Sequence, residues 1–305
     1  MWGRKDFLAI HELTRDQVAA LVARALALKQ SHHAGRLEPL LKGKALAMVF
    51  RKPSLRTRIS FEMAIVGLGG HALYISDEEI KLGRREAVSD VARVLARYVD
   101  AIMIRTFDHK EAEGLASWAP VPVINGLTDL FHPCQVLGDV MTVVEKKGRI
   151  DGLKVAYFGD GNNVANAWIE AAARLDFNLV LALARGYEPD SAVLKKSREE
   201  GARVTITYDP VEAAGGADVI YTDVWASMGA EAEGAERKKA MKHLQVNEDL
   251  LGLAKGDAIV LHCLPAHRGE EITDAVMDGA HSAVFDEAEN RMHIERAIML
   301  ELLAL

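Results

Sequence analysis

The sequence predicts an α/β protein of two doubly wound parallel-sheet domains that are similar in size and joined by long helices. Short apolar runs alternate with amphipathic runs along most of the 305 residues. One long amphipathic run, ending at Gly148, interrupts this alternation, which then starts again. Strands separated by helices form parallel sheets that are covered on both faces. The chain is also long enough for two domains of ordinary size.

The first half of the chain contains the elements of one such domain. Strands are expected where short apolar runs occur, over residues 44–50, 71–75, 101–106 and 122–127. Helices are expected where apolar residues recur at helical spacing, over residues 14–30, 59–68, 86–99, 110–118 and 133–147. Glycines end two of these helices, at Gly69-Gly70 and at Gly148. We therefore place the first domain at residues 1–148.

The second half repeats the pattern. Strands are expected over residues 154–159, 179–184, 203–208, 218–224 and 258–264, with helices between them. These elements define a second domain at residues 149–289. A last helix is expected over residues 290–305, and we expect it to pack back on the first domain.

Composition and charge narrow the class of protein. The formal net charge of −7 is not that of a protein that binds the nucleic-acid backbone, although a few arginines suffice for a local anion pocket. Two cysteines, Cys134 and Cys263, do not make a disulfide framework and indicate a reducing compartment. We find no signal peptide and no apolar stretch of about 18–20 residues that would span a bilayer. A cytoplasmic protein without membrane contact is expected.

In open α/β sheets, ligands bind at the carboxyl ends of the strands, and polar residues gather there in the first half. Ser54–Arg58 lies between the strand over residues 44–50 and the following helix, where backbone N–H groups and the helix dipole favour an anion. Arg105-Thr106 ends the third strand and is expected to converge on the same place. The alternative is an N-capped helix with solvated arginines. The segment is not a Walker loop, because the glycines and lysine of that motif are missing.

His132-Pro133-Cys134-Gln135 forms the second polar motif. Pro133 suits the first turn of a helix, which places His132 and Gln135 at the helix mouth. A histidine there is able to donate to a developing oxyanion, and a glutamine to accept from an amide. The alternative is a helix cap beside a packed histidine. We interpret Cys134 as a packing residue.

A glycine-containing turn, Gly159–Val164, follows the first strand of the second half. It resembles a dinucleotide fingerprint, but Val164 replaces the third glycine, and the next strand ends at Ala184-Arg185 where an acidic ribose ligand is expected. This disfavours a nicotinamide cofactor and an oxidoreductase. The better interpretation is a tight turn that directs Asn162 or Asn163 at a polar ligand.

Two further motifs end strands of the second half. Asp223 at the start of Asp223–Gly229 suits a ligand ammonium, the alternative being a helix-capping aspartate. Cys263 lies within His262–Glu271, which suggests either a thiol nucleophile or a metal ligand. No second cysteine is nearby, and neighbouring residues on a strand point to opposite faces, so we expect no metal.

Taken together, these motifs resemble those of the aspartate and ornithine carbamoyltransferases. Phe50–Arg58 is similar to the carbamoyl-phosphate signature, and His132–Gln135 to the H-P-x-Q motif of the whole family. Asp223–Gly229 matches the D-x-x-x-S-M-G motif of the ornithine enzymes, and His262–Pro265 matches their H-C-L-P. The resemblance runs in order through almost the whole chain, as far as Glu289-Asn290-Arg291.

The resemblance implies transfer of the carbamoyl group of carbamoyl phosphate to the δ-amine of L-ornithine, giving L-citrulline and phosphate in arginine biosynthesis or catabolism. It implies no cofactor and no metal. Arg105, His132 and Cys263 would be the catalytic residues. Carbamoyl phosphate would be bound by Ser54, Leu55 through its amide, Arg56, Thr57, Lys81, Arg105, His132, Gln135, Cys263, Leu264 and Arg291. Ornithine would be bound by Asn163, Asp223, Ser227 and Met228.

The resemblance also implies a homo-oligomer, a trimer or a multiple of trimers, whose active sites lie between subunits and receive Lys81 from a neighbour. The chain departs from the family pattern at Arg51, where an acidic residue is usual, at Lys81, where glutamine is common, and at Leu55, where threonine is commoner. Alternatives are a carbamoyltransferase for putrescine, N-acetylornithine or N-succinylornithine, and a non-catalytic relative that only binds carbamoyl phosphate.

Overall fold

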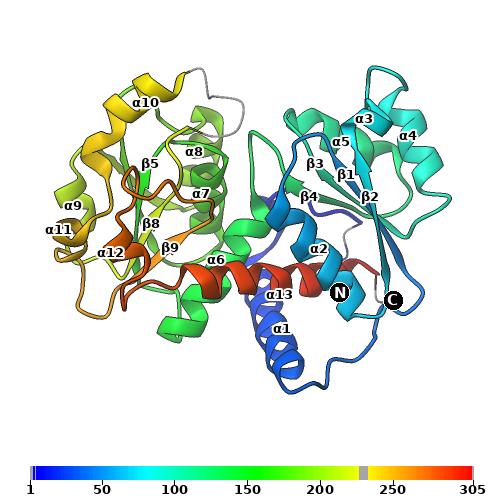
Figure 1. Cartoon of the computed structure of the whole chain (residues 1–305), viewed down its shortest axis with the longest axis horizontal. Coiled ribbons are helices and arrows are strands. Elements are labelled where there is room, and N and C mark those ends of the chain that lie inside the picture. Colours follow the sequence, from blue (N-terminus) through cyan, green and yellow to red (C-terminus); the bar gives the residue numbers. More distant parts are fainter. Residues whose placement is uncertain (1–2, 4, 227–232, 304–305) are drawn as a thin grey trace. The chain divides into compact units, whose positions relative to one another are not determined.

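A computed structural model describes residues 3, 5–226 and 233–303 and divides the chain into two compact units (Figure 1). Unit 1 consists of Met1–Gly138 and Glu289–Leu305, and unit 2 of Asp139–Ala288. The division after Gly138 falls inside helix α6 (Pro133–Lys147), before the boundary expected at 148. The last part of α13 (Val284–Leu303) is grouped with unit 1. These two helices carry the chain from one unit to the other.

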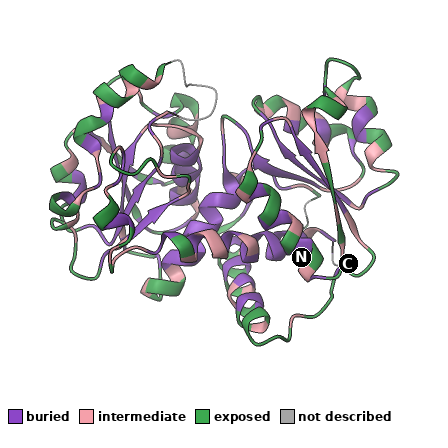
Figure 2. Ribbon diagram, viewed as in Figure 1, coloured by how far each residue is buried: buried purple, intermediate pink, exposed green. Residues whose placement is uncertain are grey.

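Unit 1 is built on a parallel sheet of four strands in the order β2-β1-β3-β4. The strands are β1 (Ala45–Phe50), β2 (His71–Ser76), β3 (Ala101–Arg105) and β4 (Val123–Leu127). The strands β1, β3 and β4 are buried almost throughout, whereas the edge strand β2 is half-buried or exposed (Figure 2). Residue Phe7 forms a parallel bridge with Ile124 and so extends the sheet beyond β4.

The other elements of unit 1 surround this sheet. They are the 3-10 helix η1 (Ile10–Glu12), α1 (Arg15–His33), α2 (Leu55–Gly67), α3 (Asp77–Ile80), α4 (Val88–Leu95) and α5 (His109–Trp118). Helix α2 begins four residues earlier than expected, since the Ser54 side chain accepts from Thr57 N–H and caps it. Helix α13 also begins earlier than expected, and the one-turn helix α3 was not expected from the sequence.

Unit 2 is built on a parallel sheet of five strands in the order β7-β6-β5-β8-β9. The strands are β5 (Lys154–Gly159), β6 (Asn178–Leu183), β7 (Arg203–Thr207), β8 (Val219–Thr222) and β9 (Ile259–His262). The helices are α7 (Asn163–Arg174), α8 (Ser191–Glu199), α9 (Pro210–Ala214), α10 (Gly234–Met241), η3 (Lys242–Leu244), α11 (Glu248–Leu251) and α12 (Asp274–Met277). All nine expected strands are present, and the predicted fold class is confirmed.

Each sheet has a point at which the order of the strands reverses. In unit 1 it lies between β1 and β3, where Phe50 is paired with Arg105. In unit 2 it lies between β5 and β8, where Phe158 is paired with Thr222. The segments that leave two such strands diverge, which creates a ligand-binding crevice at their carboxyl ends. The polar motifs after β1 and β3, and after β5 and β8, are therefore placed where such a crevice forms in each unit.

Among the described residues, no helix is both long enough and apolar enough to cross a bilayer.

Candidate active site

Ser54 caps α2 and residues 55–57 form its first turn, a short loop after the switch-point strand β1. Ser54 Oγ accepts from Thr57 N–H at 3.3 Å and also lies 3.1 Å from Thr57 Oγ1. The first-turn N–H groups of a helix have no partners within the helix and carry the positive end of its dipole. The Leu55 side chain is 69% exposed, so only its backbone is suited to binding an anion. Arg56 is half-buried in the same turn.

Thr57 connects two buried arginines of unit 1. Its hydroxyl oxygen accepts from Arg105 Nη1 at 3.2 Å and from Arg291 Nη2. Arg291 Nη1 also donates to Gln135 Oε1 at 3.1 Å. All four side chains are buried. The structure thus brings together Thr57, Arg105, Gln135 and Arg291, which the sequence predicted as ligands from four separate segments, and concentrates positive charge there.

His132 precedes α6 and is buried beside these cations. Burial and the nearby Arg291, Arg105 and Lys52 hold the pKa of His132 well below its ordinary value. The imidazole is therefore neutral at neutral pH and has one N–H to donate. Among the described side chains its Nδ1 atom is buried without a hydrogen-bond partner. A neutral imidazole near arginines is suited to polarise a carbonyl oxygen without protonating it.

Arg51, one of the departures from the family pattern, has two carboxylate partners. Arg51 Nε donates to Asp77 Oδ1 at 2.9 Å, and its Nη1 pairs with Glu111. Its side chain is 8% exposed. Asp77 is the first residue of α3, and its carbonyl accepts from Lys81 N–H at 2.8 Å. An acidic residue at position 51 would meet two carboxylates here, so the surroundings of this position are matched to a cation.

Lys81 lies at the end of α3 with a left-handed φ of 42°. Its side chain is exposed, and its backbone forms hydrogen bonds with Asp77, Arg84 and Arg85. Within the described part of unit 1, the chain itself does not bring Lys81 into hydrogen-bonding contact with Arg105 or Thr57. Its assignment to carbamoyl phosphate remains a prediction.

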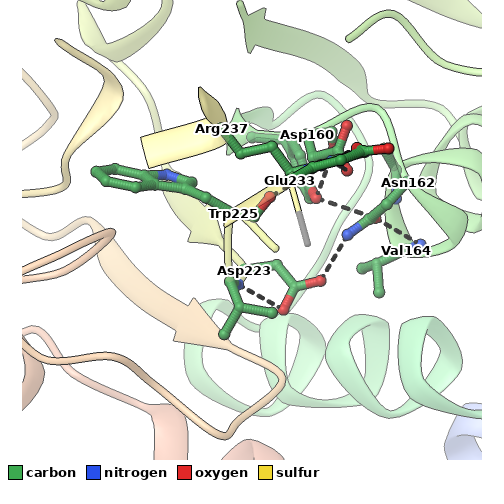
Figure 3. Close-up of polar contacts among 10 residues, drawn as sticks. Asp160, Asn162, Val164, Asp223, Trp225, Glu233 and Arg237 are labelled. Atoms are coloured by element: carbon green, nitrogen blue, oxygen red, sulfur yellow. Dashed lines mark hydrogen bonds and ion pairs between the residues drawn. The ribbon is translucent and has the colours of Figure 1, made fainter. Parts of the chain in front are cut away.

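Asp223 follows β8 in unit 2 and is the centre of a polar network (Figure 3). Its side chain is almost fully buried. Asp223 Oδ2 accepts from Asn162 Nδ2 at 2.8 Å, while Oδ1 accepts from Val224 N–H at 2.7 Å and from Cys263 Sγ at 2.9 Å. These three donors are all neutral, so their hydrogen bonds do not neutralise the carboxylate. It is thus suited to a ligand ammonium.

The other predicted ornithine ligands flank Asp223 in the sequence or follow β5. Asn163 is the first residue of α7 and is half-buried. Ser227 and Met228 lie outside the described residues, so their assignment stays a prediction.

Cys263 is a hydrogen-bond donor in this structure. Burial, followed by the nearby Asp223 carboxylate, raises the pKa of the Cys263 thiol well above its ordinary value. A protonated thiol is a poor nucleophile, which disfavours a covalent intermediate at this residue. Leu264, the next residue, has a φ of 56°, and its N–H donates to His262 Nδ1 at 2.9 Å.

Asp223, His262 and Cys263 are close enough together to be considered as metal ligands. However, both ring nitrogens of His262 are occupied. Nδ1 accepts from Leu264 N–H, and Nε2 lies 3.1 Å from Glu271 Oε1, to which it donates. The bonds that orient this histidine therefore conflict with its use as a metal ligand.

Three charged contacts near the site residues were missed from the sequence. Glu295 Oε1 accepts from Arg291 Nε at 3.2 Å, and their i,i+4 spacing on α13 was an available signal. Arg237 Nη1 pairs with Asp160 Oδ2 at 2.6 Å, and Arg237 Nε with Glu233 at 3.0 Å (Figure 3). Arg237 and Asp160 are far apart in the sequence, and no local pattern predicts their pairing.

The two sets of residues define a class: a two-domain α/β protein with a cationic set in unit 1 and a buried carboxylate in unit 2. Comparison with known families gives two consecutive matches. The carbamoyl-P binding domain of the aspartate/ornithine carbamoyltransferases matches residues 5–145, and the Asp/Orn binding domain matches residues 151–302. The chain belongs to the aspartate/ornithine carbamoyltransferase family, which confirms the resemblance seen in the sequence.

Individual relatives agree with this assignment. Ornithine carbamoyltransferase of Pelobacter propionicus is 56% identical over 300 residues, which cover 98% of each chain. The structure of ornithine carbamoyltransferase from Pyrococcus furiosus is 50% identical and covers 98% of this chain and 97% of its own, with a TM-score of 0.94. The corresponding structure from Thermus thermophilus is 43% identical, covers 98% of this chain and 99% of its own, and gives a TM-score of 0.89.

Glu295→Gln is expected to become more stable relative to the wild type as pH rises. Burial, partly opposed by Arg291, raises the pKa of Glu295 to about 7 from 4.5. The folded state then holds a proton that the unfolded state releases, so the wild type loses stability as pH rises from about 4.5 through 7. The glutamine side chain of the variant has no proton to lose. The difference in Tm between variant and wild type should grow from pH 5 to pH 8, with Glu62→Gln as a surface control. A constant difference would contradict this.

Arg51→Glu is expected to destabilise unit 1. The new carboxylate would face Asp77 and Glu111 and would leave both without their cation. Loss of one partner of a fully buried pair costs about 3–5 kcal/mol, and we expect on the order of 2 kcal/mol here because Asp77 is more than a third exposed and screened. Urea unfolding measures this cost. Arg203→Glu, at an exposed ion pair with Asp176, is the control, and an equal loss in both variants would refute the argument.

Proposed function

We propose that this chain transfers the carbamoyl group of carbamoyl phosphate to the δ-amine of L-ornithine and forms L-citrulline and phosphate. Membership of the family supports the reaction class. The curated relatives described above are named ornithine carbamoyltransferases, which supports ornithine as the acceptor. The observation that carries the proposal is the buried Asp223 carboxylate, whose donors are neutral and which suits the α-ammonium of ornithine.

The cationic set in unit 1 supports binding of carbamoyl phosphate. Ser54, Leu55 through its amide, Arg56 and Thr57 hold the phosphate at the start of α2 together with Arg105. Arginine–phosphate hydrogen bonds are charge-assisted and stronger than neutral ones. Gln135 and Arg291, which are already hydrogen-bonded to each other, orient the carbamoyl end. Cys263 and Leu264, in unit 2, are assigned to the carbamoyl amide through their carbonyls, as the resemblance implies.

The chemistry requires proton loss and charge stabilisation but no covalent intermediate. The δ-ammonium first loses a proton to the solvent. Its nitrogen then forms a bond to the carbamoyl carbon, while the bond from that carbon to the phosphate oxygen breaks. The second proton leaves the nitrogen, and the departing phosphate is the acceptor we favour. Negative charge develops on the carbonyl oxygen, where neutral His132, Arg105 and Thr57 donate.

Unit 1 supports assembly with other copies of the chain. Helix α2 carries four exposed apolar side chains along one stripe: Leu55, Ile59, Met63 and Val66. The edge strand β2 exposes Leu73 and Tyr74 as well. Exposed apolar patches of this kind mark protein interfaces. Together with the family resemblance, this supports a homotrimer, or a multiple of trimers, in which Lys81 reaches the carbamoyl phosphate of a neighbouring subunit.

The two cysteines support a reducing location. Cys134 and Cys263 are free in the structure, and free thiols are stable in the cytoplasm. We place the enzyme there and assign it to arginine biosynthesis or catabolism, as the resemblance implies.

Asp223→Asn tests the acceptor assignment. Loss of a charged contact to the ornithine ammonium should raise KM for ornithine roughly 10- to 100-fold, the equivalent of about 1.5–3 kcal/mol, while KM for carbamoyl phosphate changes little. Citrulline formation measures both constants, and Asp249→Asn, at an exposed position of unit 2, is the control. The same assay compares ornithine with putrescine and the acylated ornithines. A wild type that prefers putrescine, which has no α-carboxylate, would refute ornithine but not the reaction class.

Mixing two impaired variants tests the shared site. Lys81→Ala and Arg105→Ala trimers should each be impaired, because each lacks one cationic contact with carbamoyl phosphate. When equal amounts are dissociated and re-formed together, about a quarter of the sites in closed trimers should contain both intact residues and recover activity. Re-formed homotrimers of each variant are the controls. A lack of recovery in verified mixed trimers, with Lys81→Ala impaired, would exclude the shared site.

A further inference from the structure

Asn162 connects three parts of unit 2 through a single amide group. It caps α7, with its Oδ1 accepting from Val164 N–H at 2.9 Å and Ala165 N–H at 3.2 Å. The Tyr157 hydroxyl, from β5, lies 3.2 Å from the same oxygen. On its other side, Asn162 Nδ2 donates to Asp223 Oδ2 at 2.8 Å (Figure 3). The residue is thus held by β5 and α7 and in turn holds Asp223.

The orientation of this amide is determined by its partners. Backbone N–H groups only donate, so the atom that faces Val164 and Ala165 has to be the carbonyl oxygen. The amide nitrogen is then the atom that faces Asp223. Capping of the helix and donation to the carboxylate are therefore two consequences of one side-chain conformation.

A cation near this network, Arg237, pairs with other carboxylates. Its guanidinium pairs with Asp160 at 2.6 Å and with Glu233 at 3.0 Å. Asp223 instead receives hydrogen bonds from an amide, a backbone N–H and a thiol. A neutral donor fixes the direction of a carboxylate without cancelling its charge, which leaves the full charge for an ammonium ligand.

We propose that Asn162 is a positioning residue for the amino-acid acceptor: its amide N–H orients Asp223 for the acceptor's α-ammonium. This inference deepens the proposed function and rests on it. Asn163, the next residue, is the predicted ligand of the ornithine carboxylate. The two consecutive asparagines thus have different roles. Asn162 acts through Asp223, and Asn163 is assigned a direct contact with the ornithine carboxylate.

Asn162→Asp separates this role from helix capping. An aspartate keeps the acceptor oxygen for Val164 and Ala165 and is an equally good N-cap. However, it replaces the N–H donor with a second carboxylate against Asp223, and two such groups cannot both ionise without strong repulsion. The matched control is Asn247→Asp, because Asn247 also caps a helix of unit 2 by accepting from Leu250 N–H, at 3.0 Å.

The measured quantities are KM for ornithine, KM for carbamoyl phosphate and Tm, each from pH 6 to pH 9. For Asn162→Asp we expect KM for ornithine to rise about tenfold or more over wild type at pH 8–9. The ratio should shrink at lower pH, where a shared proton restores a donor to Asp223. KM for carbamoyl phosphate should stay near wild type, whereas Tm should fall below wild type as pH rises, because the repulsion acts in the folded state. Asn247→Asp should leave all three unchanged.

Two results would overturn the proposal. An ornithine KM within about twofold of wild type at every pH, in a folded Asn162→Asp protein, would overturn the proposal. If this variant does not fold, Asn162→Ser provides the second test, because serine caps the helix but has no amide to reach Asp223; a normal ornithine KM in that variant would also overturn it. Failure of the wild type to make citrulline would instead refute the proposed function.

Discussion

The parallel sheet is the constraint on which both sets of candidate residues depend. Parallel strands bring all their carboxyl ends to one edge, and a reversal in strand order makes the segments leaving two neighbouring strands diverge. In unit 1 this places Thr57, after β1, within hydrogen-bonding distance of Arg105, at the end of β3. In unit 2 it places Asn162, after β5, against Asp223, after β8. Residues 48 and 61 positions apart meet because of topology rather than local sequence.

Both units also bury charged side chains. The buried charge described here is positive in unit 1 and negative in unit 2. Unit 1 buries Arg105 and Arg291 around one threonine hydroxyl, and Glu295 pairs with the second of them. Unit 2 buries Asp223 with neutral donors. Burying charge is costly, and the cost falls when a ligand of opposite sign binds. An anionic carbamoyl donor and an ammonium-bearing acceptor match the signs of these two sites.

Features that depend on neighbouring residues were predicted from the sequence, whereas contacts between distant residues were not. Apolar runs are local, so all nine strands were predicted within a residue or two of their observed ends. The start of α2 was predicted too late because the apolar periodicity begins at Ile59. The helix in fact begins after its N-cap, Ser54. Motifs predicted Thr57, Arg105 and Gln135 but not which of them touch. Arg237–Asp160 had no sequence signal, since the pairing depends on how β5 and α10 pack.

Arg51 and Lys81 appear in the sequence as two separate departures from the family pattern, but the structure connects them. Arg51 pairs with the Asp77 carboxylate, and the carbonyl of the same Asp77 accepts from Lys81 N–H. Arg51 thus holds the side chain of Asp77, and Lys81 holds its backbone carbonyl. The turn that presents Lys81 is tied through Arg51 to Glu111 of α5, and hence to the body of unit 1. A cation at position 51 therefore supports the turn on which the cation at position 81 is displayed, and the two are parts of one local arrangement.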